Sequence, residues 1–185
     1  MMRIALVFYG LMGLVGVGLV AWRREGRWAF DPAAVPGADW VRWLGATLGL
    51  VLLAHALTRV GVRRWPGLRR AAEDARAWFG GLGAWRLWAL AAISGAAEEI
   101  LFRGWLMNEV GLVASSLIFG VAHVPPARHW LAWPIFAAGA GFALGGLCLG
   151  SGTLVFAVLA HAGINGMNLV WFAGARPRRG DPGIP

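Results

Sequence analysis

Lysine is absent from this 185-residue chain, cysteine occurs once, and charged residues make up only 14% of it. The single Cys148 excludes a disulfide within the chain, and we expect it to be a small buried hydrophobic side chain. Soluble domains are about 25% charged, so the shortage of charge argues against a soluble protein. The basic residues are all arginine, a compositional bias from which we infer no function.

Hydrophobic residues are abundant instead. They make up 58% of the chain, and the mean hydropathy is +0.62. This composition predicts an all-α fold, a polytopic bundle of about six transmembrane helices of about 20 residues each. The net charge of +8 comes from arginines clustered between apolar segments. That distribution indicates contact with the lipid bilayer and its headgroups rather than with nucleic acid.

The apolar segments divide the chain into a single transmembrane domain at 1–175 and a disordered tail at 176–185. The first segment also has the character of a signal peptide, but Trp22-Arg23-Arg24 is a poor cleavage site, so we expect a retained anchor. An amphipathic helix is predicted at the headgroups over 68–79. The predicted spans are residues 4–22, 40–58, 85–107, 111–124, 130–149 and 153–172.

Orientation follows from the arginine-rich loop at 59–76. Cytoplasmic loops carry the excess of basic residues, so this loop is expected in the cytoplasm. Alternation of the spans then places both termini on the same side.

Polar side chains interrupt three successive apolar segments. Charged groups at bilayer depth cost several kcal/mol, so they usually face a bundle interior and have a function. Three such clusters predict a site. The residues are Glu98, Glu99 and Arg103, then Phe119 and His123, then His161 and Asn165.

The predicted topology places these clusters at a similar depth. At 1.5 Å per residue, Glu98, His123 and His161 lie at about 14, 18 and 12 Å from one membrane face. The hydrocarbon core is about 30 Å thick, so all three fall near its middle. We therefore expect one convergent site.

Spacing within each motif predicts contacts. Glu99 and Arg103 are four residues apart, which favours an ion pair along one helix face, whereas Glu98 points about 100° away. His161 and Asn165 project together for the same reason. The ring of Phe119 is expected to pack beneath the imidazole of His123.

These side chains suit hydrolysis of an amide, which needs a base for water and donors for the developing oxyanion. A zinc site of Glu98, His123 and His161 is the competing interpretation. Against it, the ligands come from separate helices and the chain has no His-Glu-x-x-His motif. A non-proteolytic scaffold and a proton-coupled carrier remain alternatives, although no internal repeat favours a carrier.

The ordered motifs Glu-Glu-x-x-x-Arg, Phe-x-x-x-His and His-x-x-x-Asn, within 87–172, resemble the CPBP family. These are the CAAX-processing and bacteriocin-processing (Abi) intramembrane endopeptidases. The resemblance implies that Glu98 activates water with His123 as its partner, and that His161 and Asn165 lie on the oxyanion side. Glu99 and Arg103 correspond to the supporting pair.

The resemblance also implies a mechanism without metal or cofactor and a prokaryotic plasma-membrane location. It implies a substrate protein with a membrane-associated C-terminal segment. A prenylated protein, a bacteriocin leader and a C-terminal sorting tail remain open as substrates, and self-immunity to a bacteriocin remains open as a non-proteolytic role. The sequence indicates no oligomeric state.

Overall fold

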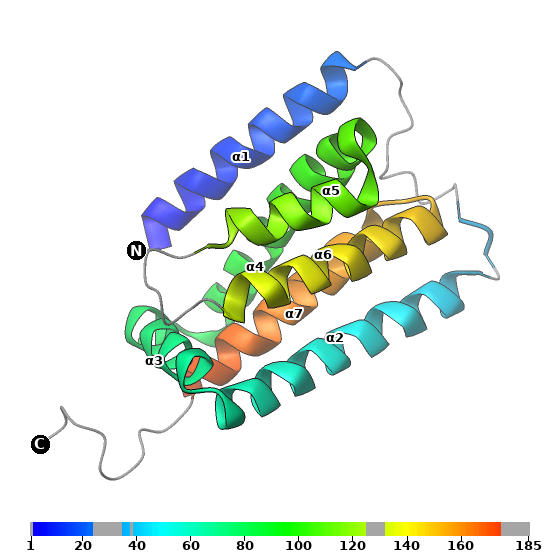
Figure 1. Cartoon of the computed structure of the whole chain (residues 1–185). Helices are drawn as coiled ribbons and strands as arrows, with labels where there is room; N and C mark the ends of the chain where they lie inside the picture. The colour runs from blue at the N-terminus through cyan, green and yellow to red at the C-terminus, as the bar shows by residue number, and fades with distance from the viewer. Residues whose placement is uncertain (1, 24–34, 38, 125–131, 175–185) are drawn as a thin grey trace, which may run out of the picture.

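The computed structural model describes residues 2–23, 35–37, 39–124 and 132–174. The predicted tail at 176–185 lies outside these residues. Every regular element within them is a helix, which confirms the predicted polytopic helical bundle (Figure 1). In chain order the helices are α1 (Met2–Trp22), α2 (Asp39–Arg64), α3 (Pro66–Phe79), α4 (Ala84–Glu99), the π-helix η2 (Ile100–Leu106), α5 (Met107–Ala122), α6 (Ala132–Ser151) and α7 (Val155–Gly174).

Five continuous helical stretches of the described chain are long and apolar enough to cross a membrane. One of them, Ala84–Ala122, contains α4, η2 and α5 together. It is broken at Gly111, where φ is 80° and ψ is 172°, a conformation that favours glycine. The remainder of α5 then runs back along the bundle (Figure 1). This stretch therefore corresponds to the two separate spans predicted on either side of Gly111.

Several observed helix boundaries differ from the predicted spans, and the end of α2 differs most. Helix α2 continues to Arg64 instead of ending at Thr58, and its last turn carries Arg63 and Arg64. Basic side chains stabilise a helix C-terminus, and Trp65 is held extended before Pro66. Helix α7 begins later than predicted, at Val155.

Glycines allow close approach between helices. A Cβ built on Gly95 of α4 would lie 3.0 Å from the backbone nitrogen of Ala162 in α7. Helix α6 carries Gly141, Gly145, Gly146 and Gly150. All except Gly146 meet neighbouring atoms within 4 Å. Small residues of this kind are how membrane helices pack tightly.

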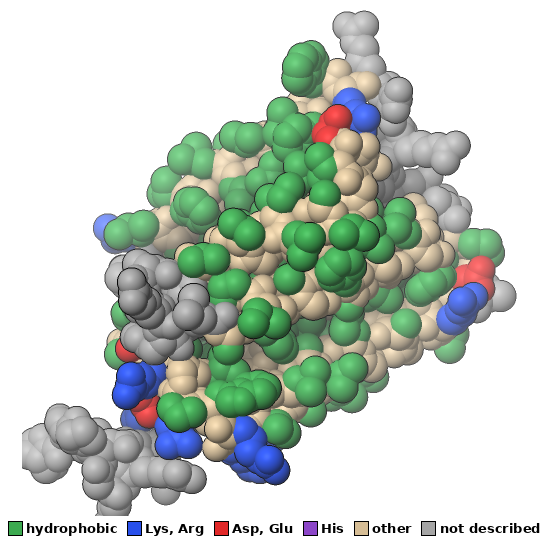
Figure 2. Space-filling model, viewed as in Figure 1, with side chains coloured by type: hydrophobic (Ala, Val, Ile, Leu, Met, Phe, Trp, Pro, Cys, Tyr) green, Lys and Arg blue, Asp and Glu red, His purple; other side chains and the backbone are tan. Residues whose placement is uncertain are grey.

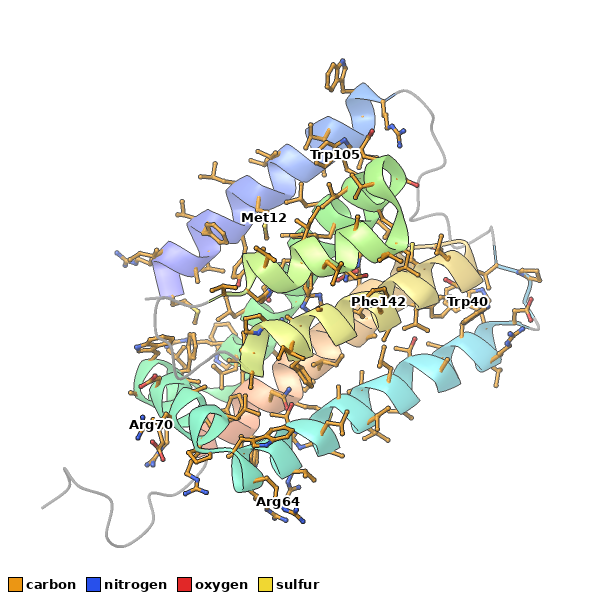
Figure 3. All side chains as sticks on the ribbon, in the orientation of Figure 1. Met12, Trp40, Arg64, Arg70, Trp105 and Phe142 are labelled. Carbon is orange, nitrogen blue, oxygen red and sulfur yellow. The ribbon has the colours of Figure 1, made fainter. Side chains whose placement is uncertain are left out.

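Hydrophobic side chains cover the flank of the bundle, and arginines gather at the end where α3 lies (Figure 2). Helix α3 is amphipathic, as predicted, with Ala71 and Ala75 buried and Arg69 and Arg70 exposed. Arg64 and Arg70 project away from the bundle at this end, whereas Trp40 lies at the opposite end (Figure 3). The molecule thus has an apolar flank between two polar ends.

Candidate active site

The centre of the site is the carboxylate of Glu99, which is fully buried at the end of α4. The Arg103 guanidinium donates through Nη1 to Oε1 of Glu99 at 2.8 Å and through Nη2 to the Gly141 carbonyl at 3.0 Å. Only 2% of the Arg103 side chain is exposed. The predicted ion pair is therefore confirmed, and it ties η2 to α6.

Arg103 lies within the π-helix η2, which follows directly on the two glutamates. A π-helical turn contains one more residue than an α-helical turn, and such turns are frequent at functional sites. The α-helical spacing used to predict the ion pair did not reveal this turn.

Phe119 of α5 packs between the charged groups. Its ring centroid lies 4.4 Å from the Arg103 guanidinium carbon and 4.4 Å from the His123 ring centroid. It also meets the His161 ring edge-on at 5.9 Å. The predicted contact with His123 is confirmed, and the cation–π contact with Arg103 is additional.

Both imidazoles are oriented through Nδ1. In His161, Nδ1 lies 2.7 Å from Oε1 of Glu99, and in His123 it lies 2.7 Å from the Phe119 carbonyl oxygen. Because a carboxylate and a carbonyl only accept hydrogen bonds, both Nδ1 atoms are the donors. Each Nε2 therefore faces the site with its lone pair or a second proton.

Glu98 faces these two Nε2 atoms. Its Oε2 lies 3.5 Å from Nε2 of His123 and 3.8 Å from Nε2 of His161. Oε2 is buried and has no hydrogen-bond partner among the described residues. The distances are long for direct hydrogen bonds, so a water molecule can bridge Oε2 of Glu98 and an imidazole Nε2.

Asn165 lies one turn beyond His161 on α7. Its Nδ2 donates to the Ser94 hydroxyl at 3.2 Å, and that hydroxyl donates to the Ala91 carbonyl at 3.2 Å. One N–H of the amide is thereby fixed to α4, and the second is available to a substrate. The sequence did not indicate Ser94, because a serine in an apolar helix usually bonds only to its own backbone.

A cavity of about 310 Å³ joins the predicted residues. Glu98, His123, His161 and Asn165 line it together with Tyr9 of α1. The opposite end of the cavity is lined by α3, at the arginine-rich end of the bundle, through Leu68, Ala71, Ala75, Trp78 and Phe79. Tyr9 was not predicted, although it is the only tyrosine in the chain and lies on the helix face of Gly13 and Gly16.

The described residues contain no group of three or more His, Cys, Asp or Glu side chains with the geometry to hold a metal ion. Nδ1 of His161 is bound to Glu99, which leaves only Nε2 of this ring facing Glu98.

A family model described as "Type II CAAX prenyl endopeptidase Rce1-like" matches residues 80–167. The match begins just before α4 and ends within α7, so it contains Glu98, His123, His161 and Asn165. Helix α1, with Tyr9, lies outside it. No curated protein and no solved structure matches the chain.

Proposed function

Because the chain belongs to the CPBP family of CAAX-processing and bacteriocin-processing endopeptidases, we propose that it cleaves a substrate protein within the membrane. The bond hydrolysed lies near the C-terminus or membrane anchor of that substrate. The observation that supports this proposal is the convergence of Oε2 of Glu98 with Nε2 of His123 and of His161 beside a cavity.

In the proposed first step, water binds between Glu98 and His123. Glu98 takes a proton from the water, and the resulting hydroxide adds to the carbonyl carbon of the scissile bond. His123 holds the water through Nε2, since its Nδ1 is fixed by the Phe119 carbonyl. A base positioned in this way contributes about 100- to 10,000-fold to a rate.

The carbonyl oxygen then carries the negative charge. In the proposal it accepts hydrogen bonds from the second N–H of Asn165 and from Nε2 of a protonated His161. The Glu99 carboxylate stabilises that imidazolium through Nδ1. With His161 protonated, two buried cations balance the two glutamates, which lowers the cost of burying the charges.

In the last step the C–N bond breaks and the proton held by Glu98 passes to the leaving amine. The second proton of the water passes from the new carboxyl group to the amine, so the products are a carboxylate and an ammonium group, and Glu98 returns to its ionised form. The whole reaction consumes one water and needs no cofactor.

Substrate access is proposed from the arginine-rich end. The cavity is lined there by apolar side chains of α3, so an extended segment with a hydrophobic anchor fits it. In the proposal this end faces the cytoplasm of a prokaryotic plasma membrane, the side that the positive-inside tendency favours.

The test is Glu98→Gln, which keeps size and hydrogen-bonding capacity but removes the base. Quenched fluorescent peptides with a hydrophobic C-terminal anchor, reconstituted with the protein in liposomes, report cleavage. We expect a loss of at least about 100-fold with an unchanged melting temperature. Incorporation of ¹⁸O from labelled water into the new carboxylate confirms hydrolysis.

The matched control is Glu109→Gln, which neutralises a glutamate paired with Arg23 at the surface. It should cleave at the wild-type rate. Treatment of the wild-type protein with a chelator should also leave the cleavage rate unchanged. If cleavage is lost to the chelator and restored by zinc, the imidazoles of the site are metal ligands. Wild-type turnover by Glu98→Gln would show that Glu98 is not the base, and absence of cleavage by the wild-type protein would favour the scaffold or carrier interpretation.

A further inference from the structure

Tyr9 is brought to the site by the way α1 packs. A Cβ on Gly13 would lie 3.6 Å from that of Ala97, and one on Gly16 would lie 3.0 Å from Ile100. Helix α1 therefore runs parallel to α4 and η2 in close contact. Tyr9 precedes Gly13 by one turn and lies on the same face, which turns its ring toward the cavity beside Glu98.

The Tyr9 phenol and the Glu98 carboxylate line the same cavity, and Glu98 is the charged group that acts on the Tyr9 hydroxyl. Oε2 of Glu98 has no partner among the described residues and faces the imidazoles. The phenol approaches the carboxylate from α1, whereas the imidazoles approach it from α5 and α7. Glu98 is consequently held between α1 on one side and α5 and α7 on the other.

The depth of Tyr9 is unusual for a membrane tyrosine. Tyrosines concentrate at the membrane interface, where the hydroxyl reaches water. Tyr9 lies about 10 Å along α1 from its first residue, at 1.5 Å per residue. A hydroxyl at that depth needs a partner within the protein, and the Glu98 carboxylate in the same cavity is suited to accept its hydrogen bond. The neighbouring Phe8, by contrast, is 60% exposed on the flank.

We propose that Tyr9 is a positioning residue of the active site, whose hydroxyl orients Glu98 so that Oε2 is presented to the water and the imidazoles. This inference rests on the proposed function for its kinetic consequence, but the contact itself is independent of any activity. It makes α1, which lies outside the family match, part of the catalytic apparatus.

The contact is tested by ¹⁹F NMR. Because the chain has a single tyrosine, growth on 3-fluorotyrosine with a tyrosine-free tag labels position 9 alone. We expect Glu98→Gln to move the fluorine resonance by more than its linewidth and Glu109→Gln to leave it in place. An unmoved resonance in Glu98→Gln would overturn the proposal, whether or not the protein is a protease.

The role is tested by Tyr9→Phe, which keeps the ring and removes the hydroxyl. We expect kcat to fall about 10-fold, the scale of one hydrogen bond to a charged group, with KM and the melting temperature unchanged. The 3-fluorotyrosine protein retains the hydroxyl and should keep wild-type kcat. A rise in KM alone, or a loss of melting temperature alone, would show packing instead of positioning.

The matched control moves the hydroxyl by one residue. Phe8→Tyr alone should retain wild-type kcat, and Phe8→Tyr combined with Tyr9→Phe should behave like Tyr9→Phe. Recovery of kcat in the double variant would overturn the proposal, because the hydroxyl at position 8 is on the exposed flank. If the wild-type protein cleaves no peptide, the proposed function fails, and the fluorine measurement still decides the contact.

Discussion

At the scale of single residues, two adjacent glutamates occupy different environments. Oε1 of Glu99 accepts hydrogen bonds from Arg103 and His161, at 2.8 and 2.7 Å. Oε2 of Glu98 has no partner among the described residues. The same side chain therefore acts as a structural anion at one position and is available as a base at the next.

Removing Glu99 should destabilise the protein. Glu99→Ala leaves a buried guanidinium unpaired and frees Nδ1 of His161, so we expect the free energy of unfolding to fall by roughly 3–5 kcal/mol. Arg103→Ala should have a similar effect, because it leaves the carboxylate unpaired. Melting temperature and expression in detergent measure both, and cleavage should be lost in each.

Glu98→Ala is the comparison. It removes a buried carboxylate with an unpartnered oxygen, so the melting temperature should stay the same or rise while cleavage is abolished. An unstable Glu98→Ala beside a stable but inactive Glu99→Ala would mean that the base is Glu99.

The sequence predicted which residues meet, but not how they are oriented. Helical spacing was sufficient for the Glu99–Arg103 pair and for Phe119 beneath His123, because both contacts lie within one segment of chain. The bond from His161 to Glu99 joins residues 62 positions apart, so local periodicity carries no signal for it. Tyr9 was missed for the same reason.

At the scale of elements, the position of His123 depends on how α5 packs against α6. Gly120 lies one turn before the end of α5. A Cβ on Gly120 would lie 2.8 Å from the Pro134 carbonyl oxygen and 2.8 Å from the Ala138 Cβ. Backbone atoms have little room to move, so the helices can accommodate an alanine only by separating.

Gly120→Ala should therefore lower the melting temperature and reduce cleavage, by about 1–3 kcal/mol of stability on the scale of overpacked sites. Gly146→Ala in α6 is the control, because nothing lies within 4 Å of its added Cβ. An alanine there should leave both measurements unchanged. Equal behaviour of the two variants would contradict a tight α5–α6 contact at Gly120.

The helices could be predicted from the sequence where the composition of a segment determines its structure. The lengths of the apolar segments predicted the membrane spans. The predicted amphipathic helix ended at residue 79, and α3 does so too. The π-helix could not be predicted, since Ile100–Leu106 has no residue that requires it. It contains Arg103, whose guanidinium bonds to Glu99 and, across to α6, to Gly141.

At the scale of the whole molecule, polarity is distributed along the bundle axis. Helix α3 and the C-terminal end of α2 carry the exposed arginines at one end. The cavity extends from Glu98 toward that end. If the protein cleaves a substrate as proposed, the side of the membrane that this end faces is also the side from which the substrate enters.

Orientation can be measured with single cysteines. Cys148 is buried, so a Cys148→Ser background provides a chain without other thiols. Glu73 on α3 and Gly37 before α2 are both exposed and lie at opposite ends of the bundle. In right-side-out vesicles a membrane-impermeant maleimide should label Gly37→Cys and spare Glu73→Cys, because the arginine-rich end is expected in the cytoplasm. Inverted vesicles should give the reverse pattern. If Glu73→Cys is labelled from outside, the bundle has the opposite orientation, and its active-site cavity receives substrates from the external face.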